Sequence, residues 1–434
     1  MRPALAALLA LMAGTAAAEN WPAWRGPRGD GVSSEPDVPL HWSEKQHLAW
    51  KTRLPEWGDS TPAVWDDAIF VTSQQDDNNL LLRIDRHSGA IQWTVTVGSG
   101  TASRAPVVAK KGDERRSQKF HGIHNLASPS PVTDGHVVAC HFGNGDVAVC
   151  DFAGHLLWKR NLQDDYGPYT IWWGHANSPV LWRNLLISVC MQDSLSDLGG
   201  PVSPSYVVAH DLRTGEVAWK TMRMTGAIDE ACDSYTTPLL VPRGDETELI
   251  LMGGRQLDAY DPATGRQRWV LPNLQGSRNV SGPTVARGVI YATQGMRGAI
   301  LAVKPGAAGE LAADAVLWRF DQGTPDACTP VVAQDRLFCI TDDGIAKCLD
   351  ARSGELQWKQ RLPGEYRASP IAAAGRIYFL NTAGLCTVVE ASPRYQVLAS
   401  NELEDMTVAS PVVSGGRLLV RGKQHLYCIV EPRP

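Results

Sequence analysis

The chain lacks the long apolar runs and the one-sided charge that mark whole classes of protein. Beyond residue 18, no stretch approaches the roughly 18 consecutive apolar residues that a membrane-spanning helix needs. The formal net charge is −5, and basic and acidic residues are interspersed along the sequence. We therefore expect neither membrane insertion nor a surface dedicated to nucleic acid.

Specific catalytic and metal-binding motifs are also missing. The nine cysteines include no CxxC spacing, so a zinc site of that type is not expected. No Gly-rich phosphate loop, nucleophile elbow or zinc-protease motif is present, and nothing favours a hydrolase. Cys140 with Cys150, and Cys339 with Cys348, flank glycine-containing turns. Each pair is either a cross-strand disulfide or two buried free thiols.

Residues 1–18 have the composition of a secretory signal peptide. Arg2 precedes an apolar stretch from residue 4 to residue 12, and the small residues Ala16–Ala18 come just before Glu19. We expect cleavage after Ala18 and a periplasmic or secreted protein, which we take to be a monomer. The residue directly after the expected cut is Glu19 rather than a cysteine, so no lipid anchor is predicted.

The sequence does contain a repeated nine-residue phrase. It runs from Asp350 to Trp358 and recurs at 85–93, 211–219 and 261–269, with Asp, Ser or Thr, Gly and Trp at the same offsets. Asp can accept hydrogen bonds from the following turn, Gly supplies a positive φ, and Trp provides a large packing surface. Each copy therefore predicts a hairpin turn and a tryptophan that docks one repeat on its neighbour.

Each repeat opens with Ser or Thr close before a proline and continues with short β-branched runs, which indicates four strands per copy. The eight opening prolines are Pro62, Pro129, Pro179, Pro238, Pro283, Pro330, Pro370 and Pro411. The docking residues are Trp93, Trp158, Trp219, Trp269, Trp318, Trp358 and Leu398, and Trp50 lies in a strand displaced to the front of the chain that completes the eighth copy.

This pattern predicts an all-β fold, an eight-bladed β-propeller of four-stranded antiparallel blades. The N-terminal strand would close the ring in the last blade and remove an open edge. The propeller is expected to span residues 48–434. An extended segment at residues 19–47, rich in proline near its start, would precede it and lie over its surface.

The segments from Ala209 to Trp219 and from Ala259 to Trp269 resemble the tryptophan-docking repeat of propellers similar to those that bind pyrroloquinoline quinone (PQQ). The resemblance covers residues 48–430, and Trp21–Gly26 resembles the start of exported bacterial PQQ-like repeat proteins. Membership of this family implies eight blades, with each tryptophan wedged between adjacent blades.

The resemblance implies one of two functional branches. Quinoprotein alcohol and glucose dehydrogenases hold PQQ and calcium over the channel with a Glu, an Asn, a catalytic Asp and often a disulfide between adjacent cysteines, and this chain has no adjacent cysteines. The other branch is non-catalytic and is typified by the outer-membrane assembly lipoprotein, which presents its propeller to protein partners. This chain lacks the lipid-attachment cysteine of that protein.

The segments that precede each opening proline should converge at one mouth of the channel, because each links an outer strand to the next inner strand. We expect a ligand site there, or polar residues that hold water and one another. The predicted site residues are Trp172, Trp173, His175, Asp233, Tyr235, Asp326, Tyr366 and Arg367. Arg367 can bind a carboxylate, and the aromatic side chains can stack on a ring.

The function predicted from these features is that of an exported, non-catalytic binding or scaffold protein. Its ligand would be a protein partner or a small polar molecule. No catalytic or metal-ligating residue is predicted, because His121 and His124 are expected to be solvated or hydrogen-bonded. The alternative is a PQQ-dependent dehydrogenase, with PQQ and calcium as cofactors, that oxidises alcohols or sugars.

Overall fold

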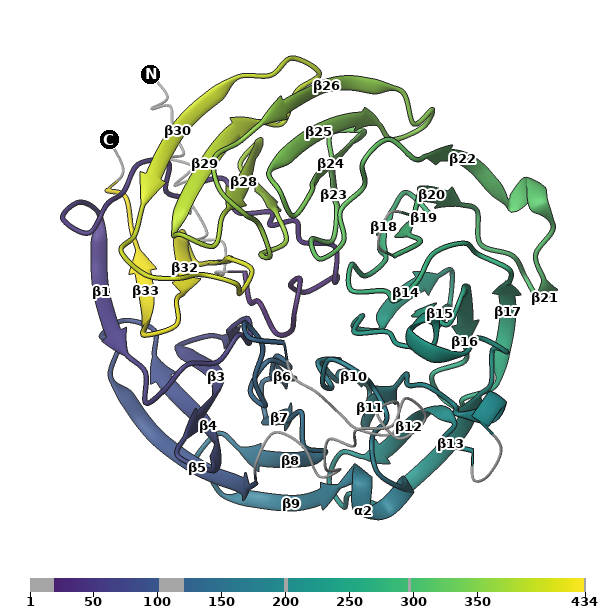
Figure 1. Ribbon diagram of the computed structural model, residues 1–434. Coiled ribbons are helices and arrows are strands. Elements are labelled where there is room, and N and C mark those ends of the chain that lie inside the picture. The colour runs from purple at the N-terminus through teal and green to yellow at the C-terminus, as the bar shows by residue number, and fades with distance from the viewer. Residues whose placement is uncertain (1–18, 101–120, 199–201, 296–297, 433–434) are drawn as a thin grey trace, which may run out of the picture.

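The computed structural model describes residues 19–100, 121–198, 202–295 and 298–432. The expected signal peptide at 1–18 lies outside the described residues. The strands form eight sheets arranged radially in a ring (Figure 1), so the predicted eight-bladed, all-β propeller is confirmed.

The first four blades follow the chain from the inner strand outwards. Blade 1 holds β2 (Ala63–Trp65), β3 (Ala68–Gln75), β4 (Asn78–Asp85) and β5 (Ile91–Ser99). Blade 2 holds β6 (Val132–Thr133), β7 (Val137–His141), β8 (Asp146–Asp151) and β9 (Leu156–Asn161). Blade 3 holds β10 (Val180–Trp182), β11 (Leu185–Cys190), β12 (Ser205–Asp211) and β13 (Val217–Arg223). Blade 4 holds β14 (Leu239–Arg243), β15 (Glu246–Gly253), β16 (Gln256–Tyr260) and β17 (Gln267–Leu271), with β21 (Gly309–Glu310) as a fifth strand.

The last four blades continue around the ring. Blade 5 holds β18 (Thr284–Ala286), β19 (Val289–Thr293), β20 (Ile300–Val303) and β22 (Val316–Phe320). Blade 6 holds β23 (Val331–Ala333), β24 (Arg336–Ile340), β25 (Ile345–Asp350) and β26 (Leu356–Arg361). Blade 7 holds β27 (Ile371–Ala373), β28 (Arg376–Leu380), β29 (Leu385–Glu390) and β30 (Val397–Glu402). Blade 8 holds β31 (Val412–Ser414), β32 (Arg417–Arg421), β33 (His425–Ile429) and β1 (Leu48–Arg53).

Helix is scarce in the described part of the chain. It comprises the five-residue α2 (Leu162–Tyr166) and three single turns of 3-10 helix at Ser196–Leu198, Asp229–Ala231 and Ala313–Ala315. No helix of the described residues is long and apolar enough to cross a membrane.

The repeated phrase folds as its residues predict. The Asp350 carboxylate accepts the backbone N–H groups of Arg352 and Ser353, both at 2.9 Å. These hydrogen bonds lower the pKa of Asp350. Gly354 follows at φ +74°, and a Cβ built there would lie 2.7 Å from the ring of Trp318 in the preceding blade. Glycine is therefore needed both for the backbone conformation and for the close approach of the docking tryptophan.

The docking tryptophans join neighbouring blades through their indole N–H groups, which donate to a backbone carbonyl in the turn of the next blade. The pairs are Trp50 with Arg86, Trp93 with Phe152, Trp158 with Leu212, Trp219 with Pro262, Trp318 with Ala351 and Trp358 with Ser392. Trp269 differs, because its N–H donates to the Glu248 carboxylate within its own blade at 3.1 Å. Blade 5 lacks the usual turn, since an insertion near 305–314 supplies β21 instead, which pairs with β17 of blade 4.

Ring closure by the displaced N-terminal strand is confirmed. β1 pairs antiparallel with β33, with Trp50 opposite Cys428. The Trp50 indole and the Thr52 hydroxyl bond to the carbonyls of Arg86 and Gly89 in blade 1, at 3.0 and 2.6 Å. Trp219 and Thr221 make the same pair of bonds to blade 4. The contact between blades 8 and 1 therefore has the same hydrogen bonds as the contact between blades 3 and 4.

The expectation that residues 19–47 lie over the surface is wrong for their first part. Trp21 is fully buried and exchanges two backbone hydrogen bonds with Val64 of β2, at 2.9 and 2.8 Å. Arg25 is only 1% exposed and donates to the carbonyl oxygens of Asp30, Pro330 and Pro370. Inner strands leave backbone groups unpaired toward the channel, and this segment satisfies several of them.

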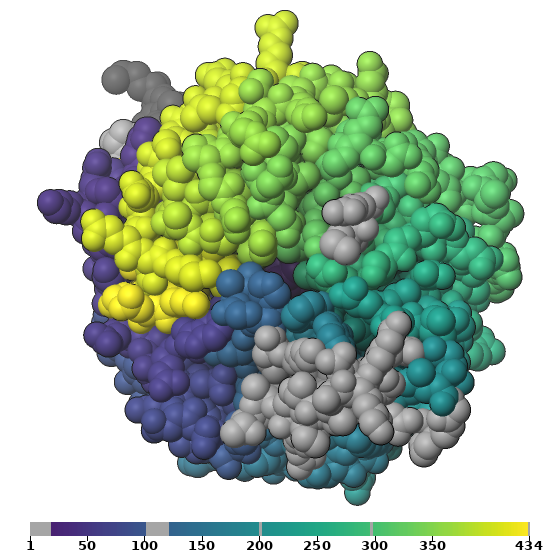
Figure 2. Space-filling model, in the orientation of Figure 1, coloured from purple at the N-terminus to yellow at the C-terminus, as the bar shows by residue number. Residues whose placement is uncertain are grey.

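The channel has two different ends. Antiparallel order places the linkers between blades, together with the turn between the second and third strands of each blade, at one end, called here the linker end. The turns after the first and third strands lie at the other, called the hairpin end. In the orientation of Figure 1, the space-filling view shows a hollow at the centre of the ring with purple N-terminal residues in its depth (Figure 2).

All nine cysteines are buried, and none of them is joined in a disulfide. In the strand register, Cys140 lies opposite Ala148 rather than Cys150, and Cys339 lies opposite Lys347 rather than Cys348. Neither pair faces across its hairpin, so of the two alternatives that the sequence allows, the structure has the buried thiols.

Candidate binding site

The linkers of blades 4, 5 and 6 hydrogen-bond to one another at the linker end. The Tyr235 N–H donates to the Asn279 carbonyl at 2.8 Å, and the Asn279 N–H donates to the Asp233 carbonyl at 3.1 Å. The Ser281 N–H donates to the Asp326 carbonyl at 3.0 Å. These bonds hold successive linkers at a similar height, and bring side chains that are far apart in sequence into one region.

An arginine connects the three linkers electrostatically. Arg278 forms ion pairs with Glu230 at 3.3 Å and with Asp326 at 2.9 Å. Glu230 also accepts the indole N–H of Trp173 at 2.9 Å. Burial raises the pKa of Asp326, against the opposing effect of Arg278. The result is a chain of polar contacts from blade 3 to blade 6 that fixes the orientation of one indole.

Asp233 lies below this chain and is only 1% exposed. One carboxyl oxygen accepts the Trp172 N–H at 2.9 Å, and the other has no hydrogen-bond partner among the described residues. Burial raises the pKa of Asp233 well above its usual range, and the nearby Asp193 and Glu230 raise it further. The Tyr235 hydroxyl accepts the Trp173 N–H at 3.2 Å. Asp233 and Tyr235 thus hold the backbone of both tryptophans.

Arg367 is engaged by carboxylates of its own chain. It forms an ion pair with Asp342 at 3.1 Å and lies 3.7 Å from Glu365. Asp342 also accepts the N–H groups of Asp326 and Ala327. Arg367 would therefore have to leave Asp342 to bind a carboxylate of a ligand with both of its outer nitrogens.

Two predicted site residues are buried away from the channel mouth. His175 is fully buried, with Nε2 2.9 Å from the Val189 carbonyl oxygen and its ring stacked on Tyr169 at 5.1 Å. Burial lowers its pKa to about 4, so the imidazole is neutral. Tyr366 is also fully buried and belongs to the core between blades 6 and 7, beside Cys328. The prediction that these two side chains line the mouth is wrong.

The structure thus brings together Trp172, Trp173, Asp233, Tyr235 and Asp326, and connects Arg367 to them through Asp342. Sequence reasoning did not select Glu230 or Arg278 for the site, although both lie in the linkers that were expected to converge. Asp342 was missed because it lies in the turn between β24 and β25. That turn reaches the same end of the channel, and its Asp342-Asp343-Gly344 sequence could have marked it as a polar turn near the site.

A second group of polar residues lies where blade 8 meets blade 1. Lys423 lies over the Trp57 ring, 4.2 Å from its centre, and a cavity of about 630 Å³ lies between Leu54–Trp57 and the facing residues of blade 8. Asp59 accepts the Ser128 hydroxyl at 3.3 Å. Burial raises the pKa of Asp59 to about 7, against the opposing effect of the Arg421 guanidinium.

We predict that Asp59 makes the protein less stable as the pH rises toward 8. The protonated carboxyl favours the folded state, so its contribution is complete below the unfolded pKa of 3.8 and is lost as the pH rises through about 7. Asp59→Asn should therefore gain about 1–2 kcal/mol relative to wild type between pH 5 and pH 8, measured by urea unfolding. The exposed Asp66→Asn is the control, and an equal gain in both variants would contradict the assignment.

The linker end does not fit a calcium ion with PQQ. Within the described ranges, no three His, Cys, Asp or Glu side chains gather closely enough to hold a metal ion. Calcium requires six to eight oxygen ligands. Arg278 and Arg367, the arginines described at this end, are already paired with Glu230, Asp326 and Asp342 and so are not free to bind the carboxylates of a quinone. The charged side chains at this end are paired with one another rather than arranged around a cation.

Comparison with known proteins supports the propeller fold and identifies the family. Residues 40–191, 203–312 and 307–422 match the family model described as outer membrane protein assembly factor BamB. The chain belongs to this family. The outer membrane protein assembly factor BamB of Yersinia pestis is 24% identical over 229 residues, which are 49% of this chain and 53% of that protein. The chain thus spans about half the length of the curated relative that it matches.

Solved structures share the fold at low sequence identity. The quinohemoprotein alcohol dehydrogenase of Comamonas testosteroni superposes with a TM-score of 0.66 at 13% identity, covering 95% of this chain and 81% of that one. BamB of Moraxella catarrhalis gives 0.59 at 12% identity, covering 88% of this chain and 99% of that one. A europium-containing methanol dehydrogenase gives 0.65 at 12% identity, with coverages of 95% and 89%. At these identities the likeness shows the fold alone.

Proposed function

We propose that the protein is an exported, non-catalytic scaffold of the BamB family that binds a partner protein at the linker end of its propeller. The observation that carries this proposal is the pair Trp172 and Trp173. Both side chains are partly exposed, their rings meet edge to face at 6.2 Å, and their backbone N–H groups are held by Asp233 and Tyr235. Rigid, partly exposed tryptophans are typical anchors of protein interfaces.

The surrounding charges support a protein ligand rather than a small cofactor. Arg278 pairs with both Glu230 and Asp326, and these paired groups form a polar rim around the indoles. An aromatic anchor with a polar rim is the usual anatomy of a protein-protein interface. BamB is named as an assembly factor for outer membrane proteins, and a periplasmic scaffold with a protein partner would match that description.

The test is site-specific photo-crosslinking in cells of the native host. A photoreactive amino acid at position 173 should give one dominant adduct, and the same amino acid at Leu156 on the outer strand of blade 2 should give none. Arg278→Ala should reduce the adduct about fivefold or more, because it frees Glu230 and the Trp173 indole that it orients. Arg319→Ala, which removes the exposed pair with Asp321, is the matched control.

Equal adducts at both positions, or an adduct insensitive to Arg278→Ala, would contradict a partner site at the linker end. The competing function, a PQQ-dependent dehydrogenase, rests on the shared fold alone. Purified protein incubated with PQQ and calcium should fail to reduce an artificial electron acceptor with alcohols or aldoses. Turnover in that assay would replace the scaffold proposal with the enzyme.

A further inference from the structure

The inner strands of the blades present backbone groups to the channel at one repeated position. In β2, Ala63 and Trp65 pair with Phe70 and Ala68, and Val64 between them pairs with Ile69. Antiparallel strands alternate hydrogen-bonded and non-hydrogen-bonded pairs, so the N–H and C=O of Val64 point away from β3 and into the channel. The same register places Leu181, Leu240, Val285, Val332 and Ala372 at equivalent positions.

The N-terminal segment already pairs with this position on one side of the ring. Trp21 exchanges hydrogen bonds with Val64, and the Pro22 carbonyl accepts the Thr133 N–H of blade 2 at 2.9 Å. In blade 7, Ala372 donates to the Gly31 carbonyl at 2.9 Å and accepts the Ser33 N–H at 2.8 Å. The N-terminal segment therefore forms bridges with blades 1 and 7 and one further bond to blade 2, which is strand addition on a small scale.

The other side of the ring keeps the same position open. Val64 and Ala372 are 0% and 3% exposed, whereas Leu240, Val285 and Val332 are all partly exposed. In the described part of the chain, none of these last three forms a backbone hydrogen bond across the channel. Backbone groups at a concave, apolar surface favour an extended ligand that can pair with them.

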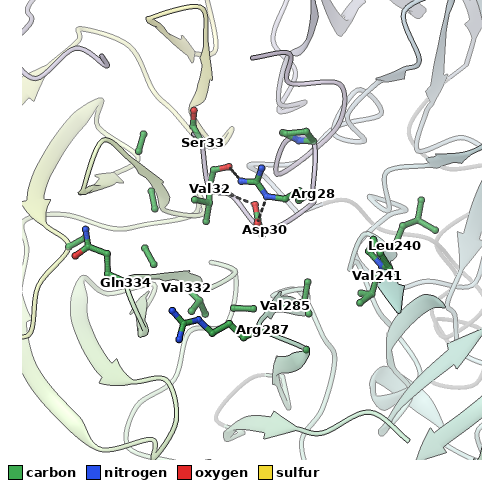
Figure 3. A pocket seen from close by; sticks show the side chains of 18 of the residues that line it. Arg28, Asp30, Val32, Ser33, Leu240, Val241, Val285, Arg287, Val332 and Gln334 are labelled. Carbon is green, nitrogen blue, oxygen red and sulfur yellow. Dashed lines mark hydrogen bonds and ion pairs between the residues drawn. The ribbon is translucent and has the colours of Figure 1, made fainter. Parts of the chain in front are cut away.

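These open positions line a cavity of about 810 Å³ at the hairpin end, between blades 4 to 7 and the segment from Pro27 to Ser33 (Figure 3). This volume is within the roughly 300–1,000 Å³ typical of ligand clefts. Short apolar side chains such as Val241, Ala286 and Ala333 form much of the wall. The cavity is thus large enough for a short extended segment with small apolar side chains.

The charged residues of the cavity wall indicate which charge a ligand would carry. Arg28, Arg287 and Arg376 line the cavity, and Asp30 is the acidic residue among its described lining residues. Arg28 is paired with Asp30 at 3.0 Å, and the exposed Arg287 is paired with Asp335 at 2.5 Å. Arg376 forms no ion pair among the described residues, and its Nη1 donates to the Val38 carbonyl at 3.0 Å, so this arginine remains to attract an acidic side chain next to the backbone bridges.

We propose that this cavity binds an extended, acidic segment of a partner protein, which pairs with the inner strands at Val285 and Val332 as residues 21–33 pair with Val64 and Ala372. The site lies at the opposite end of the channel from Trp173. It is therefore separate from the surface on which the proposed function rests, and each can fail alone.

The test uses fluorescence anisotropy with a labelled, acetylated hexapeptide of alternating valine and glutamate, titrated with the full-length mature chain. This peptide should bind, and two matched peptides should bind about tenfold more weakly, a difference of about 1.4 kcal/mol. One carries N-methylated valines and cannot donate backbone hydrogen bonds. The other carries lysine in place of glutamate. Equal binding of the N-methylated peptide, or no binding of the first peptide at 1 mM, would overturn the proposal.

Variants of the protein locate the peptide. Val285→Pro combined with Val332→Pro removes two N–H groups that point into the channel, and proline is tolerated at strand edges where the N–H is not part of the ladder. We expect about tenfold weaker binding with little change in melting temperature. Val64→Pro is the matched control, because it should lower the melting temperature by losing the bond to Trp21 and leave peptide binding intact.

Charge reversal keeps the test decisive if the proline variant fails to fold. Arg287 is exposed, so Arg287→Glu should fold, weaken the glutamate peptide and strengthen the lysine peptide. Binding that responds neither to Arg287→Glu nor to the proline pair would place the peptide elsewhere and refute the site.

Discussion

Removal of residues 19–53 is expected to abolish the cooperative unfolding of the native propeller. The deletion takes away β1, the fourth strand of blade 8, and exposes the edge of β33. It also removes Trp21 and Trp42, which are 0% and 4% exposed in the core. Truncating one such aromatic side chain costs roughly 3–5 kcal/mol, and a domain is stable by only about 5–15 kcal/mol. Thermal unfolding followed by circular dichroism measures the outcome.

A shorter deletion separates ring closure from channel filling. Removal of residues 19–47 keeps β1 and Trp50 but still removes the buried Trp21 and Trp42, so the melting temperature should fall substantially and yet remain above that of the 19–53 deletion. Arg25→Met isolates the guanidinium, which is the donor for three backbone carbonyls in the channel. Each buried acceptor left without a donor costs roughly 1–3 kcal/mol. If the 19–53 deletion melts within two degrees of the full chain, neither β1 nor the channel segment stabilises the ring.

The fold was accessible from the sequence because its specifying interactions are local. Asp350, Gly354 and Trp358 lie within nine residues, and the same residue types recur at the same offsets in other copies. The eighth copy ends before its docking tryptophan, and Trp50 has no copy of its own. Ring closure followed from these two facts, and the register of β1 with β33 confirms it.

The candidate site was less accessible, because its residues are selected by packing across blades. His175 and Asp233 both lie a few residues before the opening proline of a repeat, yet His175 turns into the core toward Val189 while Asp233 supports Trp172. No local pattern distinguishes these outcomes. The Trp21–Gly26 motif posed the same problem, since its buried partners Pro330 and Pro370 lie more than 300 residues further along the chain. Contacts between a buried arginine and residues so far away in the chain leave no periodic pattern in the sequence from which they could be predicted.

The expected cost of Trp358→Ala is roughly 3–5 kcal/mol of unfolding free energy. Trp358 is 8% exposed and packs between blades 6 and 7, with its ring 5.2 Å from that of Tyr395 and 6.0 Å from that of Phe338. Its N–H donates to the Ser392 carbonyl at 3.1 Å, so truncation leaves both a cavity and an unpaired acceptor. Chemical denaturation of the purified variant measures the loss.

Two further variants divide this cost between its physical causes. Trp358→Phe keeps most of the ring contact and loses the hydrogen bond to Ser392, so it should cost only about 1–2 kcal/mol. Leu398→Ala, at the docking position of blade 7, should also cost less than Trp358→Ala, because Leu398 is smaller and only partly buried. Trp219 is partly exposed, so Trp219→Ala should fall between them. A cost below about 1 kcal/mol for Trp358→Ala would mean that blade packing does not depend on the docking tryptophan.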